Sequence, residues 1–222
     1  MQIKDWMSRK IVTVDEETPI VQASKILNDR QIRHLPVTRE GWLVGMIRAR
    51  DVQEALPSHS AGLSAQELYF LLSEVKVRDI MQPDPITIQS EQTVEVAAVR
   101  MLSHKITALP VIGDGGELVG IISQGDVFRV LIAITGIYQG GLQFAFNLRD
   151  IAGSIKSVAD VIREEQGHMV SILSTTDTAE PGFRHVFIRI KALPDDARRR
   201  LIQRLERKFT LLYVTEDPLK ES

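Results

Sequence analysis

The sequence contains no cysteine, and this absence removes several kinds of chemistry at once. Disulfide bonds, thiolate metal sites and cysteine nucleophiles are all excluded, and the composition is compatible with a reducing compartment. A strong excess of one charge is also missing, because the formal net charge is -2 at pH 7. We therefore expect no general attraction to nucleic acid or to an anionic membrane surface.

Long apolar runs are missing as well. The longest, Val130 to Ile137, is far shorter than the ~20 residues that a membrane-spanning helix needs. Near the start of the chain, Lys4 and Asp5 interrupt any apolar run, so we expect no secretory signal. With 222 residues, 44% apolar and 25% charged, the chain can bury a substantial core, and we expect a soluble, cytoplasmic protein.

The sequence also lacks the motifs of catalysis. It contains no G-x-S-x-G, no P-loop and no G-x-G-x-x-G. Its five histidines are scattered, without the paired spacing of a metal site. We therefore predict a protein that is not an enzyme and that needs no metal and no cofactor. An enzyme is the third hypothesis, which a pocket of convergent titratable groups would favour.

What the sequence does contain is one pattern that occurs twice. The landmark pairs are Met7 with Met81, Pro36 with Pro110, Gly45 with Gly120, and Asp51 with Asp126. By subtraction, the first two pairs are 74 residues apart and the last two are 75 apart, which predicts a one-residue insertion in a loop. Such a repeat predicts two copies of one small unit that face each other across a pseudo-two-fold axis, with a cleft between them.

Each copy is expected to run strand, helix, strand, strand, helix. Pro19 is expected at the first helical position of the first helix, and a glycine lies in the turn between the last two strands of each copy. The expected elements of the first copy are 11–14, a helix opening at 18–19, 34–37, 43–47, and a helix from about residue 51. Those of the second copy are 86–88, 93–102, 108–112, 118–123 and 126–134.

Two segments do not belong to the repeat. Residues 57–64 are polar and form an expected linker, and Ser64 and Glu67 have the spacing of a capping box that begins a helix. After Gly140-Gly141 a different order begins, strand, helix, strand, strand, helix, strand, which is a ferredoxin-like βαββαβ unit. Its expected elements are 144–148, 153–165, 168–174, 183–192, 195–209 and 211–215. Helices would cover one sheet face, and the other face would need a partner.

Both copies carry a hydrophobic-Pro-Val run, then Gly-x-Leu-Val-Gly-hydrophobic-Ile, then an aspartate near the start of the next helix. In these features the chain resembles a tandem pair of CBS domains, a Bateman module. The tail resembles an ACT domain, with residues 149–153 where that family has its first loop and Ala152 in place of the family's proline. This domain order resembles the acetoin-utilisation type of CBS/ACT protein. The implied fold class is α/β (α+β), with domains at 1–58 (first repeat), 59–138 (linker helix and second repeat) and 139–222 (ACT-like).

The CBS resemblance implies an adenine nucleotide in the cleft, with the helix-start aspartate on the ribose and the preceding serine or threonine near ribose or phosphate. Carried onto this chain, the site of the second copy is Thr87, Thr107, Ala108, Pro110, Ser123 and Asp126. The site of the first copy is Thr13, Arg33, His34, Pro36, Arg48 and Asp51. Arg48 departs from the family pattern, because it stands where Ser123 stands in the other copy. The ACT resemblance implies Asp150 and Gly153 as residues of a ligand loop.

Simpler roles compete with these. Ser123 and Asp126 have the spacing of a capping box, with aspartate in place of the commoner glutamate, whereas Arg48 cannot cap a helix and Asp51 has no such partner in the first copy. Arg33, Arg48 and Arg50 form either an anion site or a set in which Arg48 fills the pocket and pairs with Asp51. Gly153 is also a residue that starts a helix. The cations of residues 198–208 are interpreted as the solvated side of an amphipathic helix rather than as a nucleic-acid surface.

The leading hypothesis is a regulator that binds AMP, ADP, ATP or S-adenosylmethionine between the CBS copies and signals through the geometry of a homodimer and through the ACT domain. The alternative is an amino-acid sensor whose CBS pair only holds a dimer together. Both hypotheses imply a regulated partner protein that the sequence does not name.

Overall fold

The computed structural model describes residues 1–55 and 73–216, which form two compact units, Met1–Phe128 and Arg129–Ser222. The linker expected at 57–64 and the capping box expected at Ser64 and Glu67 lie outside the described residues. Within the described ranges, no helix combines the length and the apolar character that crossing a membrane requires.

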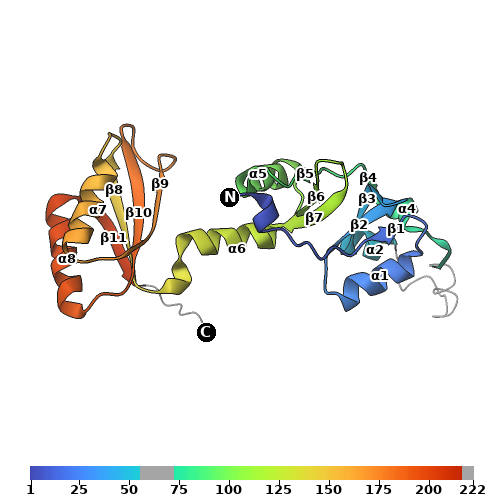
Figure 1. Cartoon of the computed structure of the whole chain (residues 1–222), viewed down its shortest axis with the longest axis horizontal. Coiled ribbons are helices and arrows are strands. Elements are labelled where there is room, and N and C mark those ends of the chain that lie inside the picture. Colours follow the sequence, from blue (N-terminus) through green and yellow to red (C-terminus); the bar gives the residue numbers. More distant parts are fainter. Residues whose placement is uncertain (56–72, 217–222) are drawn as a thin grey trace. The chain divides into compact units, whose positions relative to one another are not determined.

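The first copy has the predicted order of elements (Figure 1). They are β1 (Val14–Asp15), α1 (Ile20–Asp29), β2 (His34–Arg39), β3 (Trp42–Arg48) and α2 (Ala49–Ala55). β1 runs parallel to β2, and β2 pairs antiparallel with β3. The expectation for Pro19 was wrong by one position, because Pro19 is the N-cap of α1 and Ile20 its first residue. Leu35 and Ile47 are fully buried between the sheet and the two helices.

The second copy repeats this arrangement. Its elements are β5 (Ile88–Gln89), α5 (Val94–His104), β6 (Ala108–Ile112), β7 (Leu118–Ser123) and α6 (Gln124–Thr135). The copies differ in one hairpin. Glu40 and Gly41 form a two-residue turn with φ of 50° and 85°, the turn that suits the twist of a hairpin, whereas five residues, 113–117, join β6 to β7. The predicted insertion therefore lies in this loop.

A short segment precedes each copy and packs against the other copy. We call residues 1–8 the first leader and residues 75–83 the second leader; they contain η1 (Ile3–Asp5) in the first, and α4 (Val77–Ile80) and β4 (Gln82–Pro83) in the second. The first leader bonds to the second copy, with Ile3 N–H donating to the Gln92 carbonyl at 2.9 Å. The second leader bonds to the first copy, with Val77 N–H donating to the Thr18 carbonyl at 2.9 Å. Each copy is completed by the other copy's leader.

The repeated glycines provide the contact points for this exchange. The sulfur of Met81 packs on Gly45, and the sulfur of Met7 packs on Gly120, so closely that a methyl group on either glycine would overlap the sulfur. Met46 and Gln82 pair in the β3–β4 ladder, and Ser8 bridges to Ile121 at the corresponding place. Glycine at these two positions is explained by the close approach of a leader rather than by a turn.

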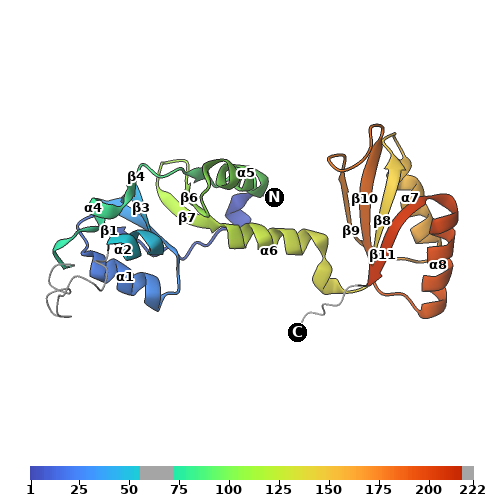
Figure 2. The ribbon, with the colours of Figure 1, turned by 180° about the vertical axis from the view of Figure 1, so that it is seen from behind.

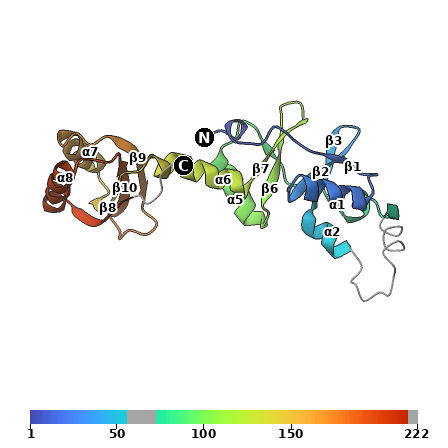
Figure 3. The same ribbon diagram turned by 90° about the horizontal axis from the view of Figure 1, so that it is seen from below.

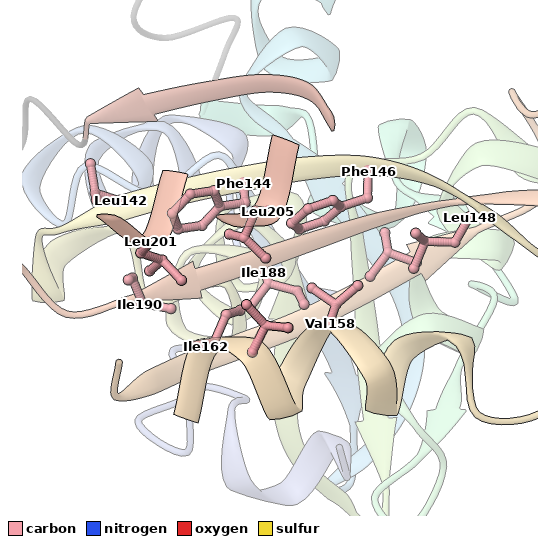
Figure 4. Close-up of a cluster of buried hydrophobic side chains, with 12 residues drawn as sticks. Leu142, Phe144, Phe146, Leu148, Val158, Ile162, Ile188, Ile190, Leu201 and Leu205 are labelled. Atoms are coloured by element: carbon pink, nitrogen blue, oxygen red, sulfur yellow. The ribbon is translucent and has the colours of Figure 1, made fainter. Parts of the chain in front are cut away.

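The second unit has the predicted βαββαβ order, seen from two further directions in Figure 2 and Figure 3. Its elements are β8 (Leu142–Arg149), α7 (Ser154–Glu164), β9 (Met169–Thr175), β10 (Phe183–Ile190), α8 (Asp195–Lys208) and β11 (Thr210–Glu216). The four strands form one antiparallel sheet in the order β11-β8-β10-β9. α7 and α8 cover one face, where Phe144, Phe146 and Ile188 are fully buried (Figure 4).

The other face of this sheet is partly covered by the chain itself, although we expected it to need a partner. Arg189 lies on that face and is only 4% exposed. Its guanidinium donates to the Thr135 carbonyl at the end of α6 and to Gln143 Oε1, and the Ser171 hydroxyl donates to the same Thr135 carbonyl at 2.9 Å. A last-turn carbonyl of α6 is therefore satisfied by side chains of the sheet.

α8 is amphipathic, and four of its cations, Arg198, Arg199, Arg200 and Arg204, pair with acids. Leu201 and Leu205 are fully buried on its inner side. On its outer side, Arg204 donates to Glu164 and Glu165 of the α7 end, and Arg199 pairs with Asp196 within α8. The interpretation of these cations as one side of an amphipathic helix is confirmed.

Candidate functional site

A cavity of about 140 Å³ lies between the two copies within the first unit. Five of its lining residues are among those predicted from the sequence: His34, Arg48, Thr107, Ala108 and Pro110. They come from β2 and β3 of the first copy and from the start of β6 and the turn before it in the second. The structure thus joins members of the two predicted sets in one cavity.

A hydrogen bond connects the copies across this cavity. His34 Nε2 and the Thr107 hydroxyl are 2.7 Å apart. His34 and Ala108 occupy corresponding positions, because His34 pairs with Arg48 as Ala108 pairs with Ser123. The histidine of one copy therefore contacts the threonine of the other, and the pseudo-symmetry offers no second bond of this kind, because alanine has no polar side chain.

The environment of His34 favours the neutral imidazole. Burial lowers the pKa of His34, the positive charges of Arg48 and Arg33 lower it further, and Asp51 opposes them weakly. At neutral pH the ring can therefore either accept from or donate to the Thr107 hydroxyl, since a neutral imidazole carries one donor and one acceptor nitrogen.

Arg48 is held by Asp51 at the edge of the cavity. The Arg48 Nη2–Asp51 Oδ1 distance is 2.6 Å, and Nε lies 3.1 and 3.0 Å from Oδ1 and Oδ2. The Arg48 backbone N–H also donates to Oδ2 at 2.7 Å. Burial alone would raise the pKa of Asp51, but these hydrogen bonds and the guanidinium charge lower it. The hypothesis that Arg48 pairs with Asp51 is confirmed.

The corresponding pair in the second copy is a capping box. Ser123 N–H and Ser123 Oγ both donate to Asp126 Oδ2 at 2.6 Å, and Asp126 N–H lies 3.3 Å from Ser123 Oγ. Asp126 is 5% exposed. Arg48 has no hydroxyl with which to cap the helix, as expected, but Asp51 still accepts the backbone N–H three residues earlier just as Asp126 does. Capping alone therefore does not distinguish the two aspartates.

Seven predicted residues do not line the cavity: Thr13, Arg33, Pro36, Asp51, Thr87, Ser123 and Asp126. Pro36 is buried within β2, and the Thr87 carbonyl accepts a hydrogen bond from Arg100 at 2.6 Å. Arg33 still acts on the site through its charge on His34, whereas Arg50 pairs with Glu54 on the exposed side of α2.

Six lining residues were missed: Met46, Gln82, Pro85, Ile86, Lys105 and Ile106. Ile86 and Ile106 each directly precede a predicted residue, Thr87 or Thr107, so their positions were a usable signal. Lys105 ends α5 with φ of 54° and adds a cation to the cavity wall. Gln82 enters through the second leader, and no local pattern predicts that exchange.

In the second unit, the two residues predicted for a ligand loop lie between β8 and α7. Asp150 Oδ1 is 2.8 Å from Nε of Arg184. Gly153 is the N-cap of α7 with φ of 87°, and a side chain added there would meet nothing within 4 Å. The role of Gly153 as a helix-start glycine is confirmed, and the positive φ explains why glycine is needed.

Comparison with known proteins agrees with this architecture. The CBS domain family matches residues 3–58 and 77–133, which cover most of both copies and of their leaders and account for half of the chain. The chain belongs to the CBS-domain family. The match ends at residue 133, before β8 begins, so the family covers the CBS pair, and the identity of the βαββαβ part of the second unit is a separate question.

Solved structures of other CBS pairs have the same fold as residues of the first unit. CBSX2 of Arabidopsis thaliana, solved in complex with AMP, is 28% identical, with a TM-score of 0.50 over 60% of this chain and 98% of that one. An AcuB protein of Vibrio cholerae, named for acetoin utilization, is 25% identical, with a TM-score of 0.51 over 62% of this chain and 94% of that one.

Curated relatives include enzymes that carry a similar pair. The homoserine O-acetyltransferase of Methanococcoides burtonii is 32% identical over 130 residues, which are 58% of this chain and 24% of that enzyme. The chain thus spans about a quarter of the length of the first curated relatives that it matches.

Proposed function

We propose that this protein is a non-enzymatic, cytoplasmic regulator that binds an adenine nucleotide (AMP, ADP, ATP or S-adenosylmethionine) between its CBS copies. The observation that carries this proposal is the cavity lined by both copies, with the His34–Thr107 hydrogen bond across it and with Arg48 and Lys105 in its wall. The AMP complex of CBSX2 supports it, because that protein is a CBS pair of the same fold.

The residues assigned to the nucleotide are those of the second copy. Thr87, Thr107 and Ala108 flank the base beside Pro110, Ser123 reaches toward the ribose or phosphate, and Asp126 holds the ribose hydroxyls, because an aspartate can accept both hydrogen bonds of a diol. Ser123 and Asp126 do not line the cavity as it stands in the structure. Drug-sized ligands occupy cavities of about 300–1,000 Å³. A cavity of about 140 Å³ encloses part of a nucleotide, so the copies must move apart, or the phosphates must extend outside.

Calorimetric titration of AMP into the wild type and Asp126→Asn tests the assignment. Loss of hydrogen bonds to a charged group costs about 1.5–3 kcal/mol, so we expect roughly 10- to 100-fold weaker binding. Asp114→Asn is the matched control, because Asp114 is an exposed carboxylate in the β6–β7 loop. Unchanged affinity in Asp126→Asn would remove the second-copy site from the proposal.

The signalling part of the proposal involves a homodimer. Three apolar residues of α5, Val96, Val99 and Leu102, follow one another at intervals of three and are 36%, 62% and 75% exposed, and Phe128 at the start of α6 is 60% exposed. Such an apolar surface suits a second copy of the chain. Val99→Glu with Leu102→Glu should convert a dimer into a monomer in sedimentation experiments, and a dimer that survives would place the contact elsewhere.

The second candidate function is an amino-acid sensor, with the second unit as an ACT domain. The observation that favours it is the βαββαβ sheet with an open loop at Asp150 and Gly153. Thermal shift against nucleotides and amino acids separates the two, because a ligand stabilises only the protein that binds it. Stabilisation by amino acids alone would replace the nucleotide proposal, and loss of that effect in Asp150→Asn would locate the site.

A further inference from the structure

Helix α6 takes part in both compact units. It runs without a break from Gln124 to Thr135, although the chain divides into its two units between Phe128 and Arg129. The helix therefore begins at the end of β7 in the second CBS copy and ends within the second unit. Because the helix itself is continuous, the contacts of its last turn determine how firmly the sheet of the second unit is joined to it.

The last turn of α6 is held by side chains from the sheet. The Thr135 carbonyl is one of the last four carbonyls of the helix, which lack partners inside it. It accepts from the Ser171 hydroxyl of β9 at 2.9 Å and from the guanidinium of Arg189 in β10. Arg189 also donates to Gln143 Oε1 of β8 at 3.1 Å. In the sheet register, Arg189 lies opposite both Ser171 and Gln143, so a row of side chains across three strands meets the helix end.

Hydrogen bonds contribute more to this contact than apolar packing does. Gly136 lies so close to Val170 of β9 that a methyl group on it would overlap the valine side chain. Beside that point the contact is incompletely filled, because a cavity of about 220 Å³ separates the segment at Ile137 from Phe187 of the sheet. Arg189 is only 4% exposed, and a hydrogen bond from a charged donor is strengthened where water is excluded.

We propose that Arg189, Ser171 and the Thr135 carbonyl form a latch that makes α6 and the sheet of the second unit move as one body. With the latch broken, the two are joined through residues 136–141, which contain three glycines with positive φ, and glycine is the residue least restricted in its backbone. A displacement of α6 in the CBS pair would then no longer reach the sheet. This inference goes beyond the proposed function, because the latch holds with or without a nucleotide.

Pulsed electron double resonance between two spin labels tests the latch in the full chain, whose lack of cysteine allows labels at chosen positions. One pair, Ala133→Cys with Glu206→Cys, joins exposed positions of α6 and α8. A reference pair, Lys156→Cys with Glu206→Cys, joins α7 to α8 within the second unit. Dilution with unlabelled chain removes distances between chains. We expect one narrow peak for each pair in the wild type, and loss of the narrow α6–α8 peak alone in Arg189→Met.

Hydrogen exchange gives a second readout at the same place. The Gly136 N–H donates to the Ile132 carbonyl at 3.1 Å and reports on the last turn of α6. Loss of hydrogen bonds from a charged donor changes a local opening equilibrium by roughly 10- to 100-fold, so exchange at Gly136 should accelerate by that factor in Arg189→Met. The amides of α7 and α8 should keep their protection, which a general loss of stability would not allow.

Matched variants separate the latch from the loss of a charge. Arg149→Met removes an exposed arginine at the end of β8 and should leave both peaks narrow. Arg189→Lys keeps the charge but loses the planar fork that reaches two acceptors, so it should restore part of the Gly136 protection. Ser171→Ala removes the weaker, neutral donor and should accelerate exchange at Gly136 less than Arg189→Met does.

A folded Arg189→Met that keeps both the narrow α6–α8 peak and the slow exchange of Gly136 overturns the proposal. A broad α6–α8 distribution in the wild type also overturns it, because the helix end is then not held in solution. If Arg189→Met broadens the α7–α8 peak as well, its second unit is not folded, and Ser171→Ala decides instead. Faster exchange at Gly136 in that variant supports the latch, and unchanged exchange overturns it.

Discussion

The two CBS copies share their backbone and differ in the side chains that face the cleft. His34 and Ala108 occupy one shared position, and Arg48 and Ser123 another. The first copy thus brings a histidine and a paired arginine to the cleft, while the second brings small groups. The leaders, in contrast, are used symmetrically, because each methionine packs on the glycine of the opposite copy. The residues that repeat in both copies determine the shared fold, and the residues that differ between the copies determine the chemistry of the cleft.

The largest loss of stability is expected from substitutions that weaken the packing of a leader against the opposite copy. Ile3 and Val77 occupy corresponding places in the two leaders, and both are fully buried. Ile3→Ala should lower the free energy of unfolding by about 2–5 kcal/mol, the usual range for removing a buried isoleucine side chain, and Val77→Ala should cost less because it removes fewer atoms. Hydrogen exchange should show lost protection in β6 and β7 for Ile3→Ala, and in β2 and β3 for Val77→Ala. The opposite assignment would refute the exchange.

A smaller loss of stability is expected when a methyl group is added to the glycines that contact the leaders. Gly45→Ala and Gly120→Ala each place a methyl group against a methionine sulfur, so each should cost about 1–3 kcal/mol in chemical denaturation. Gly45→Ala combined with Met81→Ala should cost less than the sum of the two changes. Gly125→Ala is the control, and it should raise the free energy of unfolding. Gly125 lies in the first turn of α6 with ordinary space for a methyl group, and alanine favours the helix more than glycine does. Additive costs in the double variant would argue against the contact.

The difference between His34 and Ala108 should appear as pH dependence. Because the pKa of His34 is lowered in the folded protein, the unfolded chain takes up a proton first as the pH falls. Stability should therefore decrease as the pH drops below about 6.5, the ordinary pKa of histidine, with at most about 1.4 kcal/mol for each unit of lowering. His34→Gln should remove this component in denaturation curves at pH 7.5 and 5.5. An unchanged pH dependence in the variant would assign it to other groups.

The smallest effect is expected from the exposed ion pair between the second leader and the first copy. Arg78 pairs with Glu17, and both side chains are about half exposed. Glu17→Gln should change the free energy of unfolding by less than about 1 kcal/mol, and high salt should reduce that change further. A larger and salt-insensitive loss would mean that the leader depends on charge rather than on the burial of Val77.

Much of the fold could be predicted from the repeat itself. The spacing of Pro36 and Gly45 with their counterparts gave the order of elements, and the apolar alternation of Val186, Ile188 and Ile190 gave the buried face of the second sheet. The exchange of leaders could not be predicted, because Met7 and Met81 are equally compatible with packing on their own copy. A local sequence pattern predicts which residues are buried, but it does not predict whether they pack against their own copy or against the other one.

The site was predicted less completely, and for a related reason. His34 and Ala108 were found because they occupy equivalent positions of the motif that both copies share, and both line the cavity. Lys105 and Gln82 were missed, because one is a left-handed residue at the end of a helix and the other belongs to an exchanged leader. The burial of Arg189 was missed because its partner, the Thr135 carbonyl, lies far away in the sequence at the end of another element.

The exchanged leaders also determine what a single copy could be. In a fragment that contains one copy with its own leader, the surface that normally binds the other leader is uncovered. The fragment's own leader also lacks the copy against which it normally packs. Two such fragments can satisfy each other by trading leaders, which is the logic of a domain-swapped dimer. Residues 73–135 alone should therefore associate in pairs, and the intact chain corresponds to such a pair whose two halves have been joined end to end.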